Sequence, residues 1–270
     1  MILRGNFATR WTPDNAFEHV RAIDGKVVKA KDNRRVVKFY FQGETFYLKH
    51  HRGVGWIETI KCLARVQLPV LGASDEWKAI EYLTTQGIAT MTAIAFGQTG
   101  FSPVHRESFL ITRELADTAS LESICKTWDI SPPSYAIKKA LITRVASIAR
   151  LMKEIGVNHR DFYLSHLLLS SPSTALHSHD CKPKLYLVDL HRMQIRTKVP
   201  MRWLVKDLAS IYFSSLDIGL SKRDAIRFIR EYSGTSAREA LENKQFWQAV
   251  NRRTKKLYRK DHGREAVLLL

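Results

Sequence analysis

The sequence is short of cysteine and has no long apolar run. Its three cysteines, Cys62, Cys125 and Cys181, are widely spaced and form no C-x-x-C pair, which argues against a disulfide scaffold or a zinc knuckle. The apolar stretch at the N-terminus is too short for a signal peptide, and no run reaches the ~18 apolar residues that a membrane span needs. These features favour a reducing compartment, and the sequence predicts a cytoplasmic protein.

Acidic residues are scarce relative to basic ones. The 270-residue chain has 43 Lys and Arg against 26 Asp and Glu, a formal net charge of +17. Such a surface attracts anions, which include nucleic acid, an anionic membrane, a phosphorylated substrate and an acidic protein. A nucleic-acid-binding protein is therefore one alternative, but no RNA-binding motif is present and acidic residues occupy the candidate site. We expect no nucleic-acid partner.

The first third of the chain is typical of β-strands. Arg34–Phe41 and Thr45–Lys49 are rich in β-branched and aromatic residues, and the Gln-Gly-Glu between them indicates a hairpin. Ser74–Gly87 is expected to be a helix, with Ser74 as its N-cap and Gly87 near its end. A further strand is expected at Ser108–Leu115.

The rest of the chain is mainly helical in pattern. A long amphipathic helix is expected to open at Ser131 and its two following prolines and to close at Gly156. A short buried strand lies within Lys184–Ile195, and further helices are expected at Met201–Leu216, Ser221–Tyr232 and Ser236–Lys260. The pattern predicts an α+β fold with a strand-rich N-terminal lobe (1–113), a helical C-terminal lobe (114–270) and a connector near 113–117.

Four charged residues lie at positions next to apolar segments or in a loop, where a charge suggests a function. Lys49 ends a strand, and Glu76 is in step with the apolar stripe of its helix, so it should face inward and need a cationic partner. Asp161 lies in a loop after a helix, and Asp189 ends an apolar strand. A Lys–Glu pair with two aspartates suits phosphoryl transfer, and their order along the chain matches that of kinases.

Several motifs make a resemblance explicit. His159-Arg160-Asp161 resembles the H-R-D catalytic loop of protein-kinase-like folds. The stretches GVNHRDFYLSHLLL, LKHHRGVGW, LPVLGASDEWKAI and LYLVDLHR together resemble the lipopolysaccharide core heptose(I) kinases of Gram-negative bacteria. The resemblance covers roughly residues 20–215 and implies a protein-kinase-like fold that phosphorylates the first heptose of the inner core with ATP.

The resemblance also implies roles for individual residues. Asp161 is the expected catalytic base. Contacts to ATP are expected from Lys49, Glu76 and Glu114, and Mg²⁺ ligands from Asp189 and His166. Substrate contacts are expected from Arg52, His51 and Arg160, although Arg160 could instead hold its loop.

Some features depart from the protein-kinase pattern. His166 stands where a protein kinase has a metal-binding Asn, and an imidazole suits Mg²⁺ less well than oxygen does. No G-x-G-x-x-G is present, and Tyr47 replaces the small residue that makes room for adenine. No A-P-E segment follows Asp189, which favours a small-molecule or lipid-sugar kinase over a regulated protein kinase.

The implied partners are the lipopolysaccharide core glycolipid, the anionic surface of the inner membrane, to which the enzyme would be peripheral, and acyl carrier protein. A kinase of the same fold acting on another core sugar, or on protein tyrosine or serine, is the main alternative. A catalytically dead scaffold is another.

Four further features are weighed separately. His50–Val66 is either a helix packed on its lobe or an interfacial element, and Ser171–Lys184, with two histidines and a cysteine, is a loop rather than a metal site. The basic run Arg252–Lys260 is a solvated helix end or a contact for anionic lipid. Asp207 is expected to form hydrogen bonds under the catalytic loop.

Overall fold

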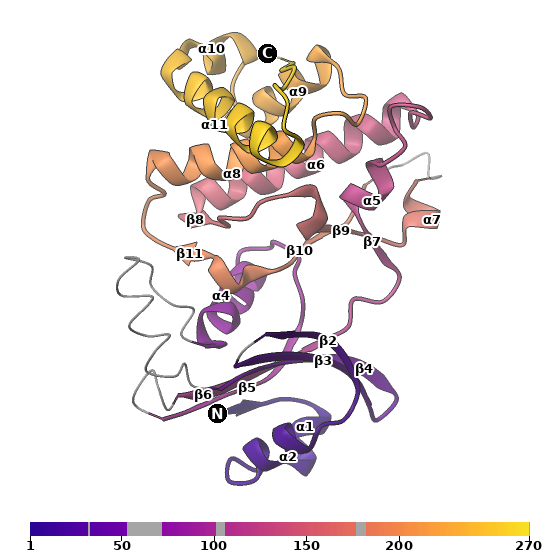
Figure 1. The fold of residues 1–270 in the computed structure, drawn as a ribbon, viewed down its shortest axis with the longest axis vertical. Coiled ribbons are helices and arrows are strands. Elements are labelled where there is room, and N and C mark those ends of the chain that lie inside the picture. The colour runs from indigo at the N-terminus through magenta and orange to yellow at the C-terminus, as the bar shows by residue number, and fades with distance from the viewer. Residues whose placement is uncertain (32, 53–71, 101–105, 177–181, 270) are drawn as a thin grey trace. The chain divides into compact units, whose positions relative to one another are not determined.

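A computed structural model describes residues 1–31, 33–52, 72–100, 106–176 and 182–269 (Figure 1). The chain divides into two compact units. The first comprises Met1–Thr85, Thr90–Ala116 and Leu190–Arg192, and the second comprises Gln86–Ala89, Asp117–Asp189 and Met193–Leu270. The segment Leu190–Arg192 therefore belongs with the N-terminal unit, although its neighbours in the chain belong to the other.

The N-terminal unit is built on a six-stranded antiparallel sheet. The strand order is β1-β5-β6-β4-β3-β2. The strands are β1 (Ile2–Leu3), β2 (Lys26–Lys31), β3 (Arg34–Phe41), β4 (Glu44–His51), β5 (Ala93–Thr99) and β6 (Glu107–Arg113). Gln42 and Gly43 join β3 to β4 with φ of 50° and 86°, the pair of positive angles that a tight type I′ turn requires.

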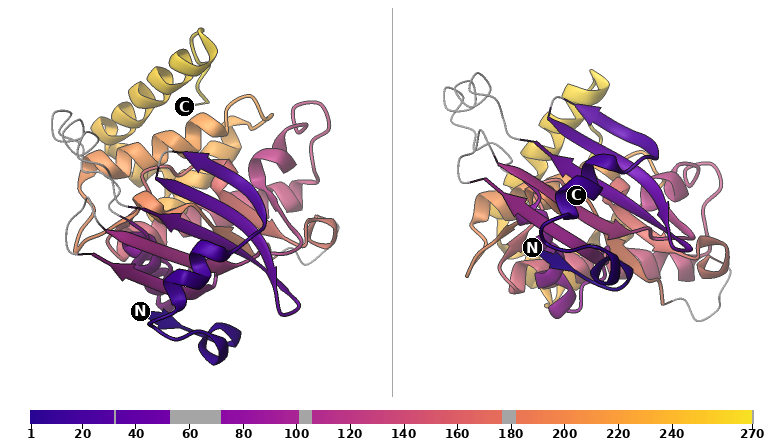
Figure 2. Two further views of the ribbon diagram at one scale, coloured as in Figure 1. Left: turned by 60° about the horizontal axis from the view of Figure 1, so that its bottom comes forward. Right: turned by 90° about the horizontal axis from the view of Figure 1, so that it is seen from below.

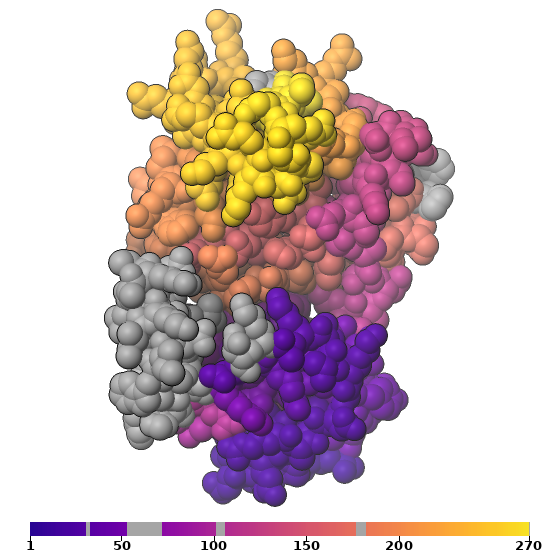
Figure 3. Space-filling model, viewed as in Figure 1, coloured from indigo at the N-terminus to yellow at the C-terminus, as the bar shows by residue number. Residues whose placement is uncertain are grey.

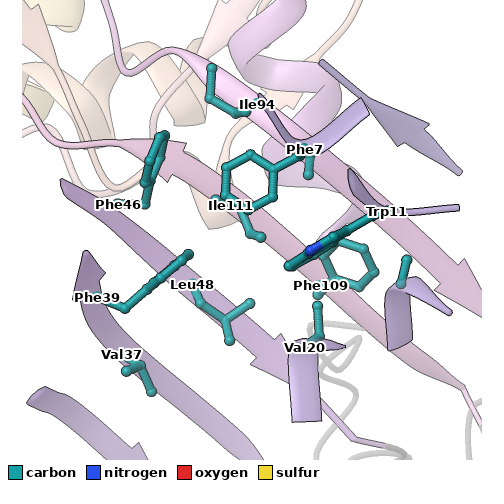
Figure 4. Close-up of a cluster of buried hydrophobic side chains, with 12 residues drawn as sticks. Phe7, Trp11, Val20, Val37, Phe39, Phe46, Leu48, Ile94, Phe109 and Ile111 are labelled. Carbon is teal, nitrogen blue, oxygen red and sulfur yellow. The ribbon is translucent and has the colours of Figure 1, made fainter. Parts of the chain in front are cut away.

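The two faces of this sheet have different coverings. Helices α1 (Asn6–Arg10) and α2 (Ala16–Ala22) lie across one face (Figure 2). Phe7 of α1 and Trp11, the residue that follows the helix, pack there with Phe46 and Leu48 of β4 in a buried aromatic and aliphatic cluster (Figure 4). Because side chains alternate along a strand, Tyr47 and Lys49 point to the opposite face.

Helix α4 (Ser74–Thr85) packs against β5 and β6. Its Trp77 ring stacks on Phe96, which precedes Gly97 in β5, with the ring centroids 5.4 Å apart. Phe46 and Leu48 face the α1–α2 cluster, so Lys49, between Leu48 and His50 in β4, is left to meet α4. The alternation of side chains along β4 therefore directs Lys49 toward α4.

The C-terminal unit is mainly helical. It contains the helices α5 (Leu121–Cys125), α6 (Tyr135–Glu154), α7 (Pro172–Ala175), α8 (Met201–Ser214), α9 (Lys222–Ser233), α10 (Ala237–Glu242) and α11 (Lys244–His262). Its short strands are β7 (Thr118–Ser120), β8 (Val157–Asn158), β9 (Leu167–Ser170), β10 (Leu185–Leu187) and β11 (Gln194–Ile195). Two 3₁₀ turns, η1 (Leu164–His166) and η2 (Leu190–Arg192), complete the described elements, and η2 packs on α4 in the N-terminal unit.

The architecture confirms the expected α+β class, with a strand-rich N-terminal part and a helical C-terminal part. The start of the long helix was wrong, because Ser134 rather than Ser131 caps α6, accepting a hydrogen bond from the Ile137 N–H. The single helix expected at Ser236–Lys260 was also wrong. Asn243 interrupts it and caps α11 through the Phe246 N–H.

Two expectations lie mainly outside the described residues, the helix within His50–Val66 and the His/Cys loop within Ser171–Lys184. Within the described part of the chain, no helix is long and apolar enough to cross a membrane.

Candidate active site

Lys49 and Glu76 form an ion pair between β4 and α4. The Lys49 ammonium contacts Glu76 Oε1, and the side chains are 14% and 1% exposed. A carboxylate buried this deeply is stable only with a cationic partner, as the sequence pattern predicted. Lys49 pairs with Val36 on one side and Leu110 on the other, so two neighbouring strands fix its place on β4. The ion pair therefore holds the Lys49 ammonium in a fixed position, and it is the lysine that keeps some access to solvent.

Glu114, expected to contact ATP, is engaged within its own unit. Its carboxylate accepts from Lys38 Nζ at 2.6 Å and from the Tyr47 hydroxyl at 3.3 Å, and its N–H donates to Thr45 at 2.9 Å. Burial and the nearby carboxylate raise the pKa of Tyr47. The Glu114 carboxylate therefore binds Lys38 and Tyr47, and the Glu114 backbone is hydrogen-bonded to β4. Lys38 was not foreseen, although it pairs with Tyr47 across the predicted hairpin.

The basic run after Lys49 divides into buried and exposed parts. His51 is 8% exposed, and burial, with Arg34 and Lys49 nearby, lowers its pKa to about 3. The imidazole is therefore neutral at physiological pH and supplies no positive charge to a substrate phosphate. Arg52 is exposed, and its N–H donates to the Asn33 carbonyl at 2.8 Å.

In the C-terminal unit, Gly156 and β8 lead from α6 into the His-Arg-Asp loop. Gly156 has φ of 75°, and a Cβ there would lie 1.7 Å from the Arg196 carbonyl oxygen, so only glycine fits. Strand β8 then pairs with β11, with Asn158 opposite Gln194. These contacts anchor the entry to the loop.

Asp207 on α8 holds the loop from below. Its carboxylate accepts hydrogen bonds from the backbone N–H groups of His159 and Arg160, both at 2.7 Å. Burial raises the pKa of Asp207 to about 6. The expected hydrogen-bonding role of Asp207 under the loop is confirmed.

His159 and Arg160 are structural parts of the loop. His159 is fully buried, its Nε2 lies 3.0 Å from the Val188 carbonyl, and burial lowers its pKa to about 4. Because a carbonyl only accepts, the neutral ring donates from Nε2. Arg160 has φ of 75°, and its guanidinium carbon lies 4.9 Å from the centre of the Trp203 ring. This stacking supports the reading in which Arg160 holds its loop.

The Asp161 carboxylate is partly exposed, with 18% of the side chain accessible. Its Oδ1 lies 3.8 Å from Lys206 Nζ on α8, and its carbonyl oxygen accepts from the Tyr163 N–H at 3.0 Å. The backbone of Asp161 is thus fixed while its carboxylate keeps access to solvent, which is what a proton acceptor needs. Sequence reasoning missed Lys206, 45 residues away along the chain.

His166 and Asp189 lie side by side. His166 Nδ1 is 2.7 Å from the Asp161 carbonyl, and Nε2 is 3.5 Å from Asp189 Oδ2. The carbonyl only accepts, so Nδ1 carries a proton and donates to it. In the neutral ring, the Nε2 lone pair then faces the Asp189 carboxylate. Asp189 has φ of 63°, a left-handed conformation that is uncommon for non-glycine residues and is tolerated best by Asn and Asp.

This arrangement fits a divalent cation. Two ligands bound to one metal at about 2.1 Å lie about 3–3.5 Å apart, which agrees with the separation of His166 Nε2 and Asp189 Oδ2. Among the described residues, no group of three or more His, Cys, Asp and Glu side chains could hold a metal. Two protein ligands suit Mg²⁺ in a kinase site, where phosphates and water complete the coordination.

Comparison with known proteins gives a consistent result. The model of the lipopolysaccharide kinase (Kdo/WaaP) family matches residues 18–232. The lipopolysaccharide core heptose(I) kinase WaaP of Escherichia coli K12 is 43% identical over 239 residues, covering 88% of this chain and 89% of that protein. The protein of the same name from Pseudomonas aeruginosa is 42% identical over 265 residues, covering 96% of each.

A solved structure is similar too. "WaaP in complex with acyl carrier protein" superposes with a TM-score of 0.81 at 37% identity, covering 95% of this chain and 98% of that chain. The family model spans both units and includes Lys49, Glu76, Asp161, His166 and Asp189. The chain belongs to the lipopolysaccharide kinase (Kdo/WaaP) family.

Proposed function

We propose that this protein transfers the γ-phosphoryl group of ATP to a hydroxyl of the first heptose of the lipopolysaccharide inner core. The supporting observation for the acceptor is 42–43% identity to heptose(I) kinases over at least 88% of the chain. The supporting observation for the chemistry is the grouping of Asp161, His166 and Asp189 in one unit, with a held lysine in the other.

Lys49 binds the phosphates of ATP in this proposal. Its ammonium is a strong donor to phosphate oxygens, and Glu76 fixes its direction. The backbone of Glu114, held by its N–H bond to Thr45, is the group of that residue that we assign to ATP binding, because its carboxylate is engaged. The Tyr47 side chain lies beside Glu114 and would narrow the space for the adenine ring.

Asp161 accepts the proton of the acceptor hydroxyl. The hydroxyl oxygen attacks the γ-phosphorus, the bond from phosphorus to the β–γ bridging oxygen breaks, and its electron pair stays on ADP. A Mg²⁺ ion bound by Asp189 and His166 would neutralise charge on the β- and γ-phosphates. The bond from His166 Nδ1 to the Asp161 carbonyl fixes the orientation of the imidazole relative to the base.

The test is mass spectrometry of core oligosaccharide incubated with enzyme, ATP and Mg²⁺. The parent should add one phosphate to the oligosaccharide, and Asp161→Ala should abolish the transfer while leaving nucleotide affinity within about threefold. Asp129→Ala, an exposed aspartate of the same unit, is the matched control and should keep full turnover. Near-parental turnover of Asp161→Ala rules out its role.

Generic protein substrates and other core sugars are run in parallel. Phosphate on protein tyrosine or serine, with none on core oligosaccharide, would replace the heptose acceptor with the protein-kinase alternative. A core lacking the first heptose should receive no phosphate.

Arg52 is the substrate contact we retain, because it is exposed and permanently charged. His51 is neutral and buried, so it supplies no charge to a core phosphate. Arg160 stacks on Trp203 and keeps its charge, so it stays a second candidate for this contact. Arg52→Gln should raise KM for the glycolipid with little change in KM for ATP.

We also propose acyl carrier protein as a partner. The similar solved structure is described as WaaP in complex with that protein, and the net charge of +17 suits an acidic partner. The C-terminal unit contains an apolar cavity of about 120 Å³ between α5, α6, α8, α9 and α11, where the end of an acyl chain would fit. Cys125 lines it.

Native mass spectrometry of purified protein mixed with acylated and unacylated carrier protein tests this partner. Preference for the acylated form, reduced by Cys125→Phe at unchanged melting temperature, supports it. Equal binding of both forms removes the role of the cavity.

The anionic membrane surface is the last proposed contact. Figure 3 shows the C-terminal part of the chain, which includes α11, in yellow on the surface. Six exposed cations of α11 would face lipid head groups: Arg252, Arg253, Lys255, Lys256, Arg259 and Lys260. Lys255→Glu with Lys256→Glu should reduce sedimentation with vesicles containing anionic lipid. Neutral vesicles should bind neither form, and equal sedimentation of both forms with anionic vesicles would exclude this face.

A further inference from the structure

Lys206 lies beside Asp161 and has no role in the function proposed above. It lies on α8, one residue before Asp207, and its Nζ is 3.8 Å from Asp161 Oδ1. The same helical turn thus fixes the backbone of the loop through Asp207 and places an ammonium beside the carboxylate of the loop. The Lys206 side chain is 14% exposed, so most of its stem is buried and its head has little freedom.

Lys206 and Asp161 form a long salt bridge. A separation of 3.8 Å is longer than an N–H···O hydrogen bond, so the two groups attract each other without a direct hydrogen bond. Nζ also lies 5.7 Å from the centre of the Trp203 ring, which limits where the ammonium can move. The ammonium therefore lies beside the carboxylate, within reach of the same solvent-accessible side of the loop.

The position of Asp161 limits where the acceptor hydroxyl can bind. A proton acceptor must lie about 2.6–3.2 Å from the oxygen it deprotonates. Because Nζ is 3.8 Å from the same carboxylate, it lies within about 7 Å of that oxygen whatever the direction of approach. The attacked phosphorus is about 3–3.5 Å from the acceptor oxygen, so the ammonium and the γ-phosphoryl group both lie close to the Asp161 carboxylate during transfer.

We propose that Lys206 is a catalytic residue that donates a hydrogen bond from its ammonium to a non-bridging oxygen of the γ-phosphoryl group as that group passes to the acceptor. This inference rests on the proposed kinase function and adds a residue to it. The proton of the acceptor still goes to Asp161, and the electron pair of the broken bond still goes to ADP. Lys206 keeps its protons throughout and stabilises the negative charge spread over the equatorial oxygens.

A cation at this point has a second effect on the site. Asp161 and the transferred phosphoryl group are both negative, and their approach is unfavourable unless a positive charge lies beside them. Lys49 belongs to the other unit and pairs with Glu76, whereas Lys206 belongs to the same unit as Asp161 and lies beside its carboxylate. Loss of its charge should act on the chemical step more than on ATP binding.

The test compares three variants. Lys206→Met removes the charge and keeps the length of the side chain, whereas Lys206→Arg keeps the charge. Arg202→Met is the matched control, since Arg202 is an exposed cation on the same helix whose guanidinium carbon lies 5.3 Å from the same Trp203 ring. Lys206→Met should lower kcat by about 10²–10³-fold, the loss typical of one donor to transition-state charge.

The other expected results separate catalysis from structure. KM and Kd for MgATP should stay within threefold in Lys206→Met, and the melting temperature should stay close to that of the parent. Lys206→Arg should recover at least tenfold of the lost kcat, and Arg202→Met should match the parent. A parallel loss in nucleotide affinity, or an unchanged kcat in Lys206→Met, overturns the proposal.

A second measurement is independent of the acceptor. The complex of MgADP with aluminium fluoride mimics the transferred phosphoryl group, and Lys206→Met should bind it at least tenfold more weakly than the parent while binding MgADP alone equally. Equal binding of the mimic by both proteins overturns the role of Lys206. Absence of phosphate transfer to core oligosaccharide by the parent, with the mimic result as expected, would instead refute the heptose acceptor and leave Lys206 in place.

Discussion

Asp207 offers the sharpest test of how the catalytic loop is held. Asp207→Ala removes the acceptor of two backbone N–H groups, those of His159 and Arg160, each bonded at 2.7 Å. A hydrogen bond to a charged group contributes about 1.5–3 kcal/mol, so the two together contribute about 3–6 kcal/mol. We take the lower end, about 3 kcal/mol, because the pKa of about 6 shows that burying this carboxylate is itself costly.

Urea unfolding at pH 8, followed by tryptophan fluorescence, measures this loss directly. Trp203 on α8 contacts Arg160 of the loop, so the signal includes the region affected. Asp261→Ala, which removes an exposed carboxylate on α11, is the control and should change the free energy of unfolding by less than about 0.5 kcal/mol. A free energy of unfolding for Asp207→Ala within about 1 kcal/mol of the parent, with unchanged kcat, would refute the reasoning.

Three further outcomes are expected. Glu76→Ala should lower the free energy of unfolding by about 3 kcal/mol and raise KM for ATP, whereas Glu81→Ala on the exposed face of the same helix should cost less than about 1 kcal/mol. His51 has a folded pKa of about 3, below its ordinary 6.5, so the unfolded chain binds the proton first and stability is lost as pH falls below 6.5. Between pH 7 and pH 5 this group costs about 2 kcal/mol, and His51→Gln should reduce that pH dependence in urea titrations. Gly156→Ala should destabilise far more than Gly87→Ala in the same titrations, because both have positive φ but only Gly156 would place a Cβ against backbone.

The sequence predicted those elements whose signals are local. The β3–β4 hairpin follows from strand alternation around a Gln-Gly turn, and the buried position of Glu76 follows from its place in an apolar stripe. Capping was less predictable. Two serines flank the prolines before α6, and the choice of Ser134 over Ser131 depends on where the chain enters the packed helix. Asn243 was missed as a helix break because a single asparagine is compatible with a helix interior.

Several N-terminal elements had no usable sequence signal. Helices α1 and α2 are only five and seven residues long, and β1 has two residues. Such short elements form because Phe7 and Trp11 are buried on the sheet, which is a tertiary effect. Local propensity has little to say about them.

The candidate site divides in the same way. Asp161, Asp189 and Lys49 were singled out because they lie in short motifs. The position of His166 Nε2 facing Asp189 depends on which ring nitrogen bonds the Asp161 carbonyl, and that is visible only in three dimensions. The place of Lys206 depends on the packing of α8 under the loop, and the braced carboxylate of Glu114 depends on a cross-strand pair with Lys38.

The register of β4 has a consequence for anyone who alters this chain. The direction of Lys49 is set by the register of β4 against β3 and β6, and side chains in a strand alternate. A slip of β4 by one place would turn the ammonium toward the aromatic cluster under α1, with every motif still intact. The register of β4 is therefore as necessary for the direction of Lys49 as the lysine itself. Sequence comparisons that score motifs alone would not detect a change in this register.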